Sequence, residues 1–136
     1  MPSVGYSGAS LAKKLGIKPG IELLVVNGPE NYRKLVEPLP DNVKLVSSLS
    51  DTTGMVHLFV TRKAELVRLL KSFRAKLNTS GVIWVSWPKK AAKVPTEVTD
   101  NTVREVALPL GFVDIKVCAV DDVWSGLKVV LRKELR

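Results

Sequence analysis

The sequence has few of the residues on which nucleophilic active sites and disulfide-rich folds depend. It contains one cysteine, Cys118, and one histidine, His57, and aromatic residues make up 6% of its 136 residues. A single cysteine excludes an internal disulfide and a thiolate metal cluster. The sequence also lacks a Gly-x-Ser-x-Gly segment and a phosphate-binding loop. We therefore predict no nucleophilic catalytic residue and no metal site.

Long hydrophobic runs are also absent. No run approaches the roughly 18 apolar residues of a membrane span, and residues 1–6 lack the basic start and apolar stretch of a secretion signal. We expect a soluble cytoplasmic protein. Its length and its composition, with 46% hydrophobic and 25% charged residues, predict one globular domain over residues 1–136. Residues 1–9, which include Gly5 and Gly8, are expected to be flexible.

Positive charge is in excess, with 21 basic and 13 acidic residues giving a net charge of +8. The excess is spread along the chain rather than gathered in a tail. Such a surface can attract anionic small molecules, nucleotides, nucleic acid or acidic proteins, and it can equally serve solubility.

The hydrophobic pattern alternates between short apolar runs and amphipathic segments. We predict strands at 21–26, 43–46, 55–60, 82–86, 114–120 and 127–133, and helices at 10–15, 29–36, 62–77 and 97–110. Strands that alternate with helices form parallel sheets with helices on both faces. The turn between the last two strands is too short for a crossover, so this pair should be an antiparallel hairpin. The predicted fold class is a three-layer α/β domain.

In open α/β sheets, ligands bind outside the carboxyl ends of the strands. The residues that the predicted strands deliver to this edge are polar, charged or aromatic. They are Asn27, Gly28, Arg62, Ser86, Trp87, Lys89, Lys90, Asp121, Asp122 and Trp124. We predict a binding site there for an anionic small molecule or a nucleotide.

Each of these residues also has a structural interpretation. Trp87 could stack on a ligand ring or simply cover the core. Lys89 and Lys90 could hold a phosphate or stay solvated. Asp121 and Asp122 could bind a metal, act as a general base or cap backbone amides in the turn. The opposite charges could also neutralise one another across the edge.

Two other features have competing interpretations. His57 and Cys118 lie in the middle of apolar strands, which favours a buried neutral histidine bonded to backbone and a small core thiol over catalytic roles. The helix at 62–77 carries six basic residues: Arg62, Lys63, Arg68, Lys71, Arg74 and Lys76. This charged face could bind nucleic acid, and it is also what any surface helix presents to water.

The layout resembles the class I methyltransferase fold. The resemblance covers residues 10–134 and consists of strand–helix units followed by Gly111-Phe112 and a closing hairpin. It implies a six-stranded sheet with the order 2-1-3-4-6-5, whose last strand is antiparallel. The family's glycine-rich turn after the first strand is replaced here by Val26-Asn27-Gly28-Pro29-Glu30, and Ser47 and Ser48 stand where an acidic residue usually binds the ribose.

Four segments of the chain are also similar to segments of a family of small uncharacterised bacterial proteins, which is classed as a domain of unknown function. They are Gly5-Tyr6-Ser7-Gly8, the segment 14–20, Val85-Ser86-Trp87-Pro88-Lys89-Lys90 and the segment 120–128. This resemblance implies a bacterial cytoplasmic protein and supplies no activity.

From the missing cofactor motif we expect no cofactor and a non-catalytic ligand-binding or regulatory domain rather than an enzyme. One alternative is a methyltransferase that binds S-adenosylmethionine through an atypical motif. The other is nucleic-acid binding by the basic helix.

Overall fold

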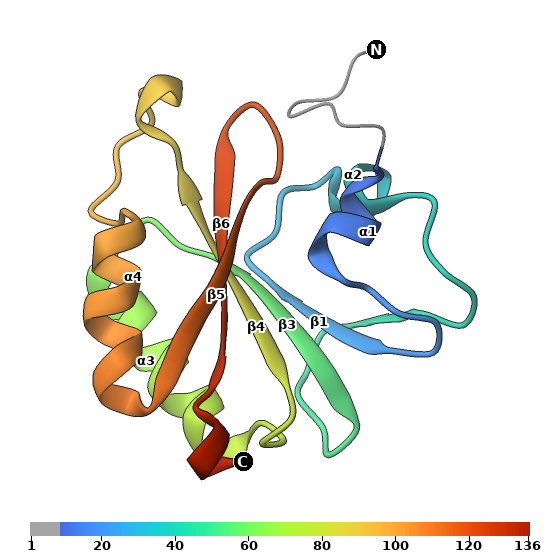
Figure 1. Ribbon diagram of the computed structural model, residues 1–136. Helices are drawn as coiled ribbons and strands as arrows, with labels where there is room; N and C mark the ends of the chain where they lie inside the picture. The colour runs from blue at the N-terminus through green and yellow to red at the C-terminus, as the bar shows by residue number, and fades with distance from the viewer. Residues whose placement is uncertain (1–8) are drawn as a thin grey trace.

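The computed structural model describes residues 9–136, so residues 1–8 of the predicted flexible segment lie outside the described part. Within residues 9–136 the chain forms a six-stranded sheet with two helices on each face (Figure 1). The strands are β1 (Glu22–Val26), β2 (Lys44–Val46), β3 (Thr53–Phe59), β4 (Val82–Pro88), β5 (Phe112–Ala119) and β6 (Trp124–Leu131). The helices are α1 (Leu11–Leu15), α2 (Tyr32–Val36), α3 (Lys63–Lys76) and α4 (Asp100–Ala107). Short 3-10 turns occupy Lys90–Ala92, Leu108–Leu110 and Lys133–Leu135.

The sheet order is β2-β1-β3-β4-β6-β5. β1 to β4 pair in parallel, while β6 runs antiparallel to both β4 and β5. The three-layer fold class and the predicted order are therefore confirmed. The reversal of β6 follows from the short β5–β6 turn, which leaves no room for a crossover helix.

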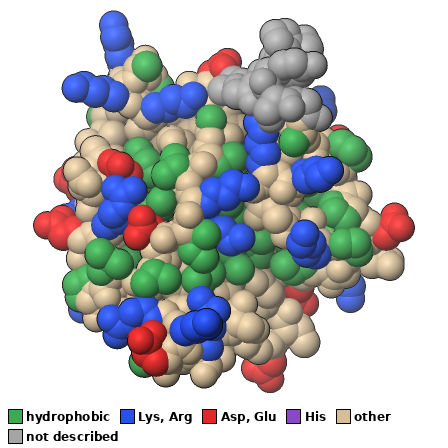
Figure 2. Space-filling view, in the orientation of Figure 1, with side chains coloured by type: hydrophobic (Ala, Val, Ile, Leu, Met, Phe, Trp, Pro, Cys, Tyr) green, Lys and Arg blue, Asp and Glu red, His purple; other side chains and the backbone are tan. Residues whose placement is uncertain are grey.

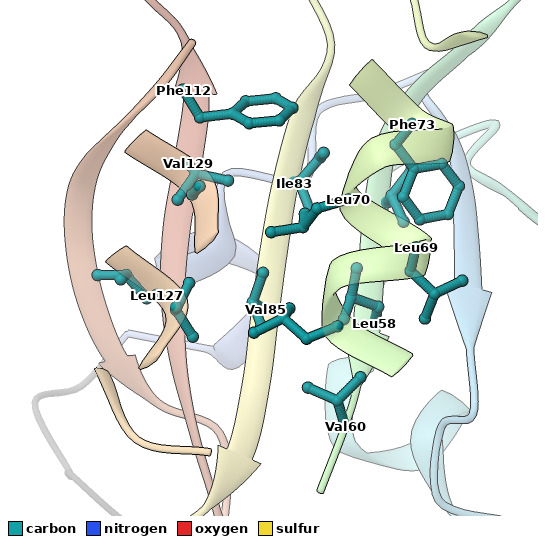
Figure 3. Packing of buried hydrophobic residues seen from close by; sticks show 14 of the residues in the cluster. Leu58, Val60, Leu69, Leu70, Phe73, Ile83, Val85, Phe112, Leu127 and Val129 are labelled. Carbon is teal, nitrogen blue, oxygen red and sulfur yellow. The ribbon is translucent and has the colours of Figure 1, made fainter. Parts of the chain in front are cut away.

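The two faces of the sheet carry separate hydrophobic cores. On one face, α3 and α4 pack on side chains from β3, β4 and β6, and Figure 3 shows Leu70 of α3 beside Ile83 of β4. On the other face, the short helices α1 and α2 cover a second group that includes the fully buried Trp84. β4 contributes to both cores, which is why almost every residue of this strand is apolar.

Trp84 links the second core to α1. Its indole Nε1 donates a hydrogen bond to the Leu15 carbonyl at 2.9 Å. Ser10 caps the start of α1, because its Oγ accepts a hydrogen bond from the Lys13 amide. Gly16 ends the helix in the left-handed region, with φ of 79°, where a glycine is favoured.

Several element boundaries differ from the predicted ones. Helix α4 begins at Asp100 rather than 97, because Thr99 and Thr102 form a reciprocal capping box that fixes the start. It then tightens into a 3-10 turn that contains Pro109, whose ring cannot continue the α-helix. β6 starts at Trp124, so this residue belongs to the strand rather than to the preceding turn. β5 contains a register irregularity between Asp114 and Lys116.

No helix in the described part of the chain is both long enough and apolar enough to cross a membrane.

Replacing Trp84 with phenylalanine tests the link to α1. The change leaves the buried Leu15 carbonyl without its donor, which typically costs about 1–3 kcal/mol of unfolding free energy. Urea denaturation of the two proteins measures this loss. The control is Trp124→Phe, since Trp124 is only half-buried and its indole makes no hydrogen bond within residues 9–136. An equal or larger loss in the control would show that the bond to Leu15 is unimportant.

Candidate functional site at the carboxyl edge of the sheet

The carboxyl edge brings together two of the predicted segments. The Lys89 amide donates to the Val123 carbonyl at 2.8 Å, and Pro88 pairs with Trp124 across β4 and β6. The end of β4 and the β5–β6 turn are thus one continuous piece of surface. Lys89 is half-buried, and Lys90 is exposed in the 3-10 turn that follows.

Two residues predicted for this site are buried instead. Trp87 is 7% exposed and belongs to the core beneath α3 and α4, and Ser86 is fully buried. Of the two interpretations of Trp87, the one in which it covers the core agrees with its position. Neither side chain is open to a ligand at the edge, because β4 continues through Pro88 and both residues stay within the sheet.

Asp121 serves the turn. Its Oδ1 accepts from the amides of Val123 and Trp124, each at 2.8 Å, which matches the predicted capping role. Asp122 is exposed. Trp124 packs edge-on against Phe59, with ring centroids 5.0 Å apart, and it covers the second core more than it offers a free face.

At the end of β1, Asn27 reaches across to α3. Its Nδ2 donates to Oε2 of Glu65 at 3.3 Å, and Glu65 also lies 3.8 Å from the Arg68 guanidinium. Arg62 is exposed at the residue that precedes α3. The carboxylate of Glu65, about one-third exposed, was missed at the sequence level. Two features of the sequence could have indicated Glu65. It is the one acidic residue of the basic helix, and it lies in the first turn of α3, the helix that follows β3.

The β1–α2 loop does not form an open cradle. Asn27 has a φ of 58°, and a Cβ added to Gly28 would come within 2.5 Å of Val25 Cγ1 and 3.6 Å of the Phe59 ring. The space beside this glycine is filled by the protein itself. The exposed Ser47 and Ser48 follow β2 in place of a carboxylate. S-adenosylmethionine held in the family's usual manner does not fit these residues. The hydrogen-bonded pair of Asn27 and Glu65, and the exposed Arg62 three residues before Glu65, offer an amide, a carboxylate and a guanidinium to a charged ligand.

Beneath the edge lies a fully buried histidine. His57 Nδ1 is 2.8 Å from the Tyr32 hydroxyl, and Nε2 is 2.7 Å from Ser86 Oγ. The ring also stacks on Phe59 at 4.4 Å. Burial lowers the pKa of His57 to about 3, so the imidazole is neutral. The predicted buried neutral histidine is present, but its partners are side chains of α2 and β4 rather than backbone groups.

Cys118 is buried, and burial raises the pKa of its thiol. Its position agrees with the predicted role of a small core residue. A raised pKa leaves less thiolate at neutral pH, which is unfavourable for a nucleophile.

The basic helix uses half of its cationic side chains internally. Lys63 Nζ pairs with Glu105 at 3.1 Å, Arg68 lies beside Glu65, and Arg74 Nε donates to the Leu110 carbonyl at 2.8 Å. Lys71 and Lys76 are exposed. Nucleic-acid binding by this helix stays a prediction.

The solved structures that match this chain include several methyltransferases. A S-adenosylmethionine-dependent methyltransferase from Aquifex aeolicus is 14% identical, with a TM-score of 0.63, over 90% of this chain and 88% of that one. Fibrillarin from Aeropyrum pernix, solved with natively bound S-adenosylmethionine, is 13% identical, with a TM-score of 0.54, over 84% and 68%. An O-methyltransferase from neocarzinostatin biosynthesis, also in complex with S-adenosylmethionine, is 14% identical, with a TM-score of 0.61, over 83% and 49%. No family model and no curated protein sequence matches the chain.

These comparisons correct the expectation against an enzyme. That expectation was wrong because it gave the missing glycine motif more weight than the fold. Two of the structures above with this fold are methyltransferases by name, and two were solved with S-adenosylmethionine bound. The non-catalytic interpretation gains no support from them. At 13–14% identity the likeness establishes the fold alone. The bacterial and cytoplasmic assignments stay predictions.

The buried histidine makes stability depend on pH. Between about pH 6.5, the ordinary pKa in an unfolded chain, and about 3 in the fold, only the unfolded chain binds this proton. The free energy of unfolding should therefore fall as the pH drops below about 6.5, by up to about 1.4 kcal/mol per pH unit from this residue. Urea denaturation between about pH 5 and 7, where most carboxylates stay ionised, measures the slope. In His57→Gln the slope should flatten, although stability at pH 7 falls; equal slopes in the two proteins would refute the assignment.

Proposed function

We propose that the protein is a S-adenosylmethionine-dependent methyltransferase that holds its cofactor with side chains at the end of β1 and the start of α3. The observation that carries the proposal is the sheet, with its order β2-β1-β3-β4-β6-β5 and antiparallel β6, together with its match to solved methyltransferases. In such sheets the ligand site lies outside the carboxyl ends of the strands, near β1.

The chemistry of the edge residues suits the amino-acid and ribose parts of this cofactor. The Glu65 carboxylate can accept hydrogen bonds from an ammonium group or from ribose hydroxyls, and Asn27 already holds its Oε2 in place. The exposed Arg62 can pair with a carboxylate. When bound, the cofactor supplies a methyl group on a positively charged sulfur that a nucleophile can attack.

The chain's own residues limit what can assist the reaction. His57 is fully buried and both of its ring nitrogens are engaged, so it cannot accept a proton from a substrate at the edge. Positioning at the edge is then the main contribution of the protein. Acceptors that are nucleophilic at neutral pH without a general base suit this arrangement best.

Calorimetric titration with S-adenosylmethionine and with its demethylated product S-adenosylhomocysteine tests the proposal. Saturable binding is expected, with a dissociation constant between about 1 µM and 1 mM, the range in which enzymes commonly bind their substrates. Glu65→Gln should weaken binding about tenfold or more, since a hydrogen bond to a charged group is worth about 1.5–3 kcal/mol.

The matched control is Glu134→Gln, which removes one exposed carboxylate from the turn that follows β6. It should bind both compounds as the unmodified protein does. The absence of heat for both compounds at millimolar concentration would overturn the proposal. An equal loss in the two variants would remove Glu65 from the site.

A further inference from the structure

Lysine side chains from three separate segments repel one another on the face of the sheet that carries α1. Lys116 of β5 is the direct cross-strand partner of Lys128 of β6, and Lys18 comes from the turn after α1. Figure 2, in the orientation of Figure 1, shows basic side chains gathered over the β5–β6 hairpin and the neighbouring helix. We call Lys18, Lys116 and Lys128 the lysine cluster.

The cluster is a place of uncompensated charge. Lys128 is half-buried, and burial lowers the pKa of its ammonium; the positive charges of Lys116 and Lys18 lower this pKa further. Within residues 9–136 none of the three lysines forms an ion pair. Like charges directly opposite one another on neighbouring strands are destabilising. The fold therefore retains an arrangement that an anion would relieve.

A hydrogen bond partly explains the position of Lys116, because its Nζ donates to the Lys14 carbonyl at the end of α1, at 3.1 Å. That bond gives Lys116 a structural role. It does not account for Lys128, whose ammonium group makes no hydrogen bond within the described residues. A solvated surface lysine needs no acceptor, but Lys128 is drawn partly out of water.

A pocket adjoins the cluster at the amino end of β4, opposite to the carboxyl edge. Its volume is about 250 Å³. Basic side chains, hydroxyls and an apolar wall line it: Lys128, Arg136, Thr79, Ser80, Val82, Val130 and Ile115. Arg136 is held there because its Nε donates to the Leu131 carbonyl at 2.7 Å, and Ile115 is 55% exposed. No acidic side chain is among these residues.

We infer that the lysine cluster and this pocket form a second ligand site, for a small molecule that carries two or more phosphate groups. The phosphates lie on the cluster, where each accepts hydrogen bonds from ammonium groups. The apolar wall of Val130 and Ile115 accepts the remainder of the ligand. This site is separate from the proposed cofactor site, so the two stand or fall independently.

Thermal unfolding at constant ionic strength tests the inference, with pyrophosphate and ADP as probes and sodium chloride as the balancing salt. A ligand that binds only the folded state raises the melting temperature, by about 4 °C at ten times its dissociation constant for a chain of this size. Pyrophosphate should stabilise the protein, and ADP should bind more tightly because it also uses the apolar wall.

Three variants sharpen the test. Lys128→Met should abolish the response to both probes while raising the melting temperature of the unliganded protein, because it removes a repelled, half-buried charge. Lys18→Met, at an exposed position, should weaken the response at least threefold and keeps the test decisive if Lys128→Met does not fold. Lys71→Met is the control: it removes one exposed charge from α3, on the opposite face of the sheet, and should respond normally.

A flat response to both probes would overturn the inference, as would an equal loss in Lys71→Met, which would indicate a general charge effect. Binding of a short single-stranded RNA with the same dependence on Lys128, in the absence of any response to pyrophosphate and ADP, would also overturn it in favour of a nucleic-acid surface. An unchanged affinity for S-adenosylhomocysteine in Lys128→Met is expected, since that compound binds at the other end of the strands.

Discussion

The buried histidine is the constraint around which the α1–α2 side of the protein is arranged. A fully buried imidazole must have partners for both nitrogens, and His57 takes one from α2 and one from β4. Tyr32 can reach it only if α2 begins close above the sheet. The β1–α2 loop is consequently short and tightly packed, with Gly28 against Val25 and Phe59. A polar network in the core thus determines the shape of the edge where a ligand would bind.

This packing explains why the loop differs from a glycine-rich cradle. An open cradle needs empty space beside the loop, and here Val25, Phe59 and Tyr32 fill the space beside Gly28. Tyr32 and Trp124 each pack edge-on against Phe59. Polar groups capable of contacting a cofactor are displaced towards α3, where Asn27 meets Glu65. The missing motif and the displaced carboxylate are two aspects of the same packing.

The fold could be predicted from the sequence because its determinants are local. Alternating apolar runs are enough to predict the strands and helices, and a short last turn is enough to reverse β6. The order of the strands in the sheet came from the resemblance to the methyltransferase fold. Side-chain placement at the edge could not be predicted in the same way. Trp87 and Ser86 follow an apolar run just as surface residues would, and only the pairing of β4 with β3 and β6 buries them.

Contacts between segments that are distant in the sequence could not be predicted from it either. The Asn27–Glu65 bond joins residues 38 positions apart, and the pairing of Lys116 with Lys128 depends on a register irregularity within β5. Composition indicates an excess of positive charge, but only the register of β5 and β6 pairs Lys116 with Lys128, and only the packing of α1 on the sheet brings Lys18 near them. The two proposed sites, at opposite ends of the strands, are therefore products of the tertiary structure.

The most direct test of the central claim is an amide chemical-shift map of the protein titrated with S-adenosylhomocysteine. The account predicts that perturbed amides cluster at Asn27 and Gly28 and across Thr61 to Glu65, with little change around Lys128. Shifts confined to the lysine cluster, or no shifts at millimolar ligand, would contradict a cofactor site at the carboxyl edge.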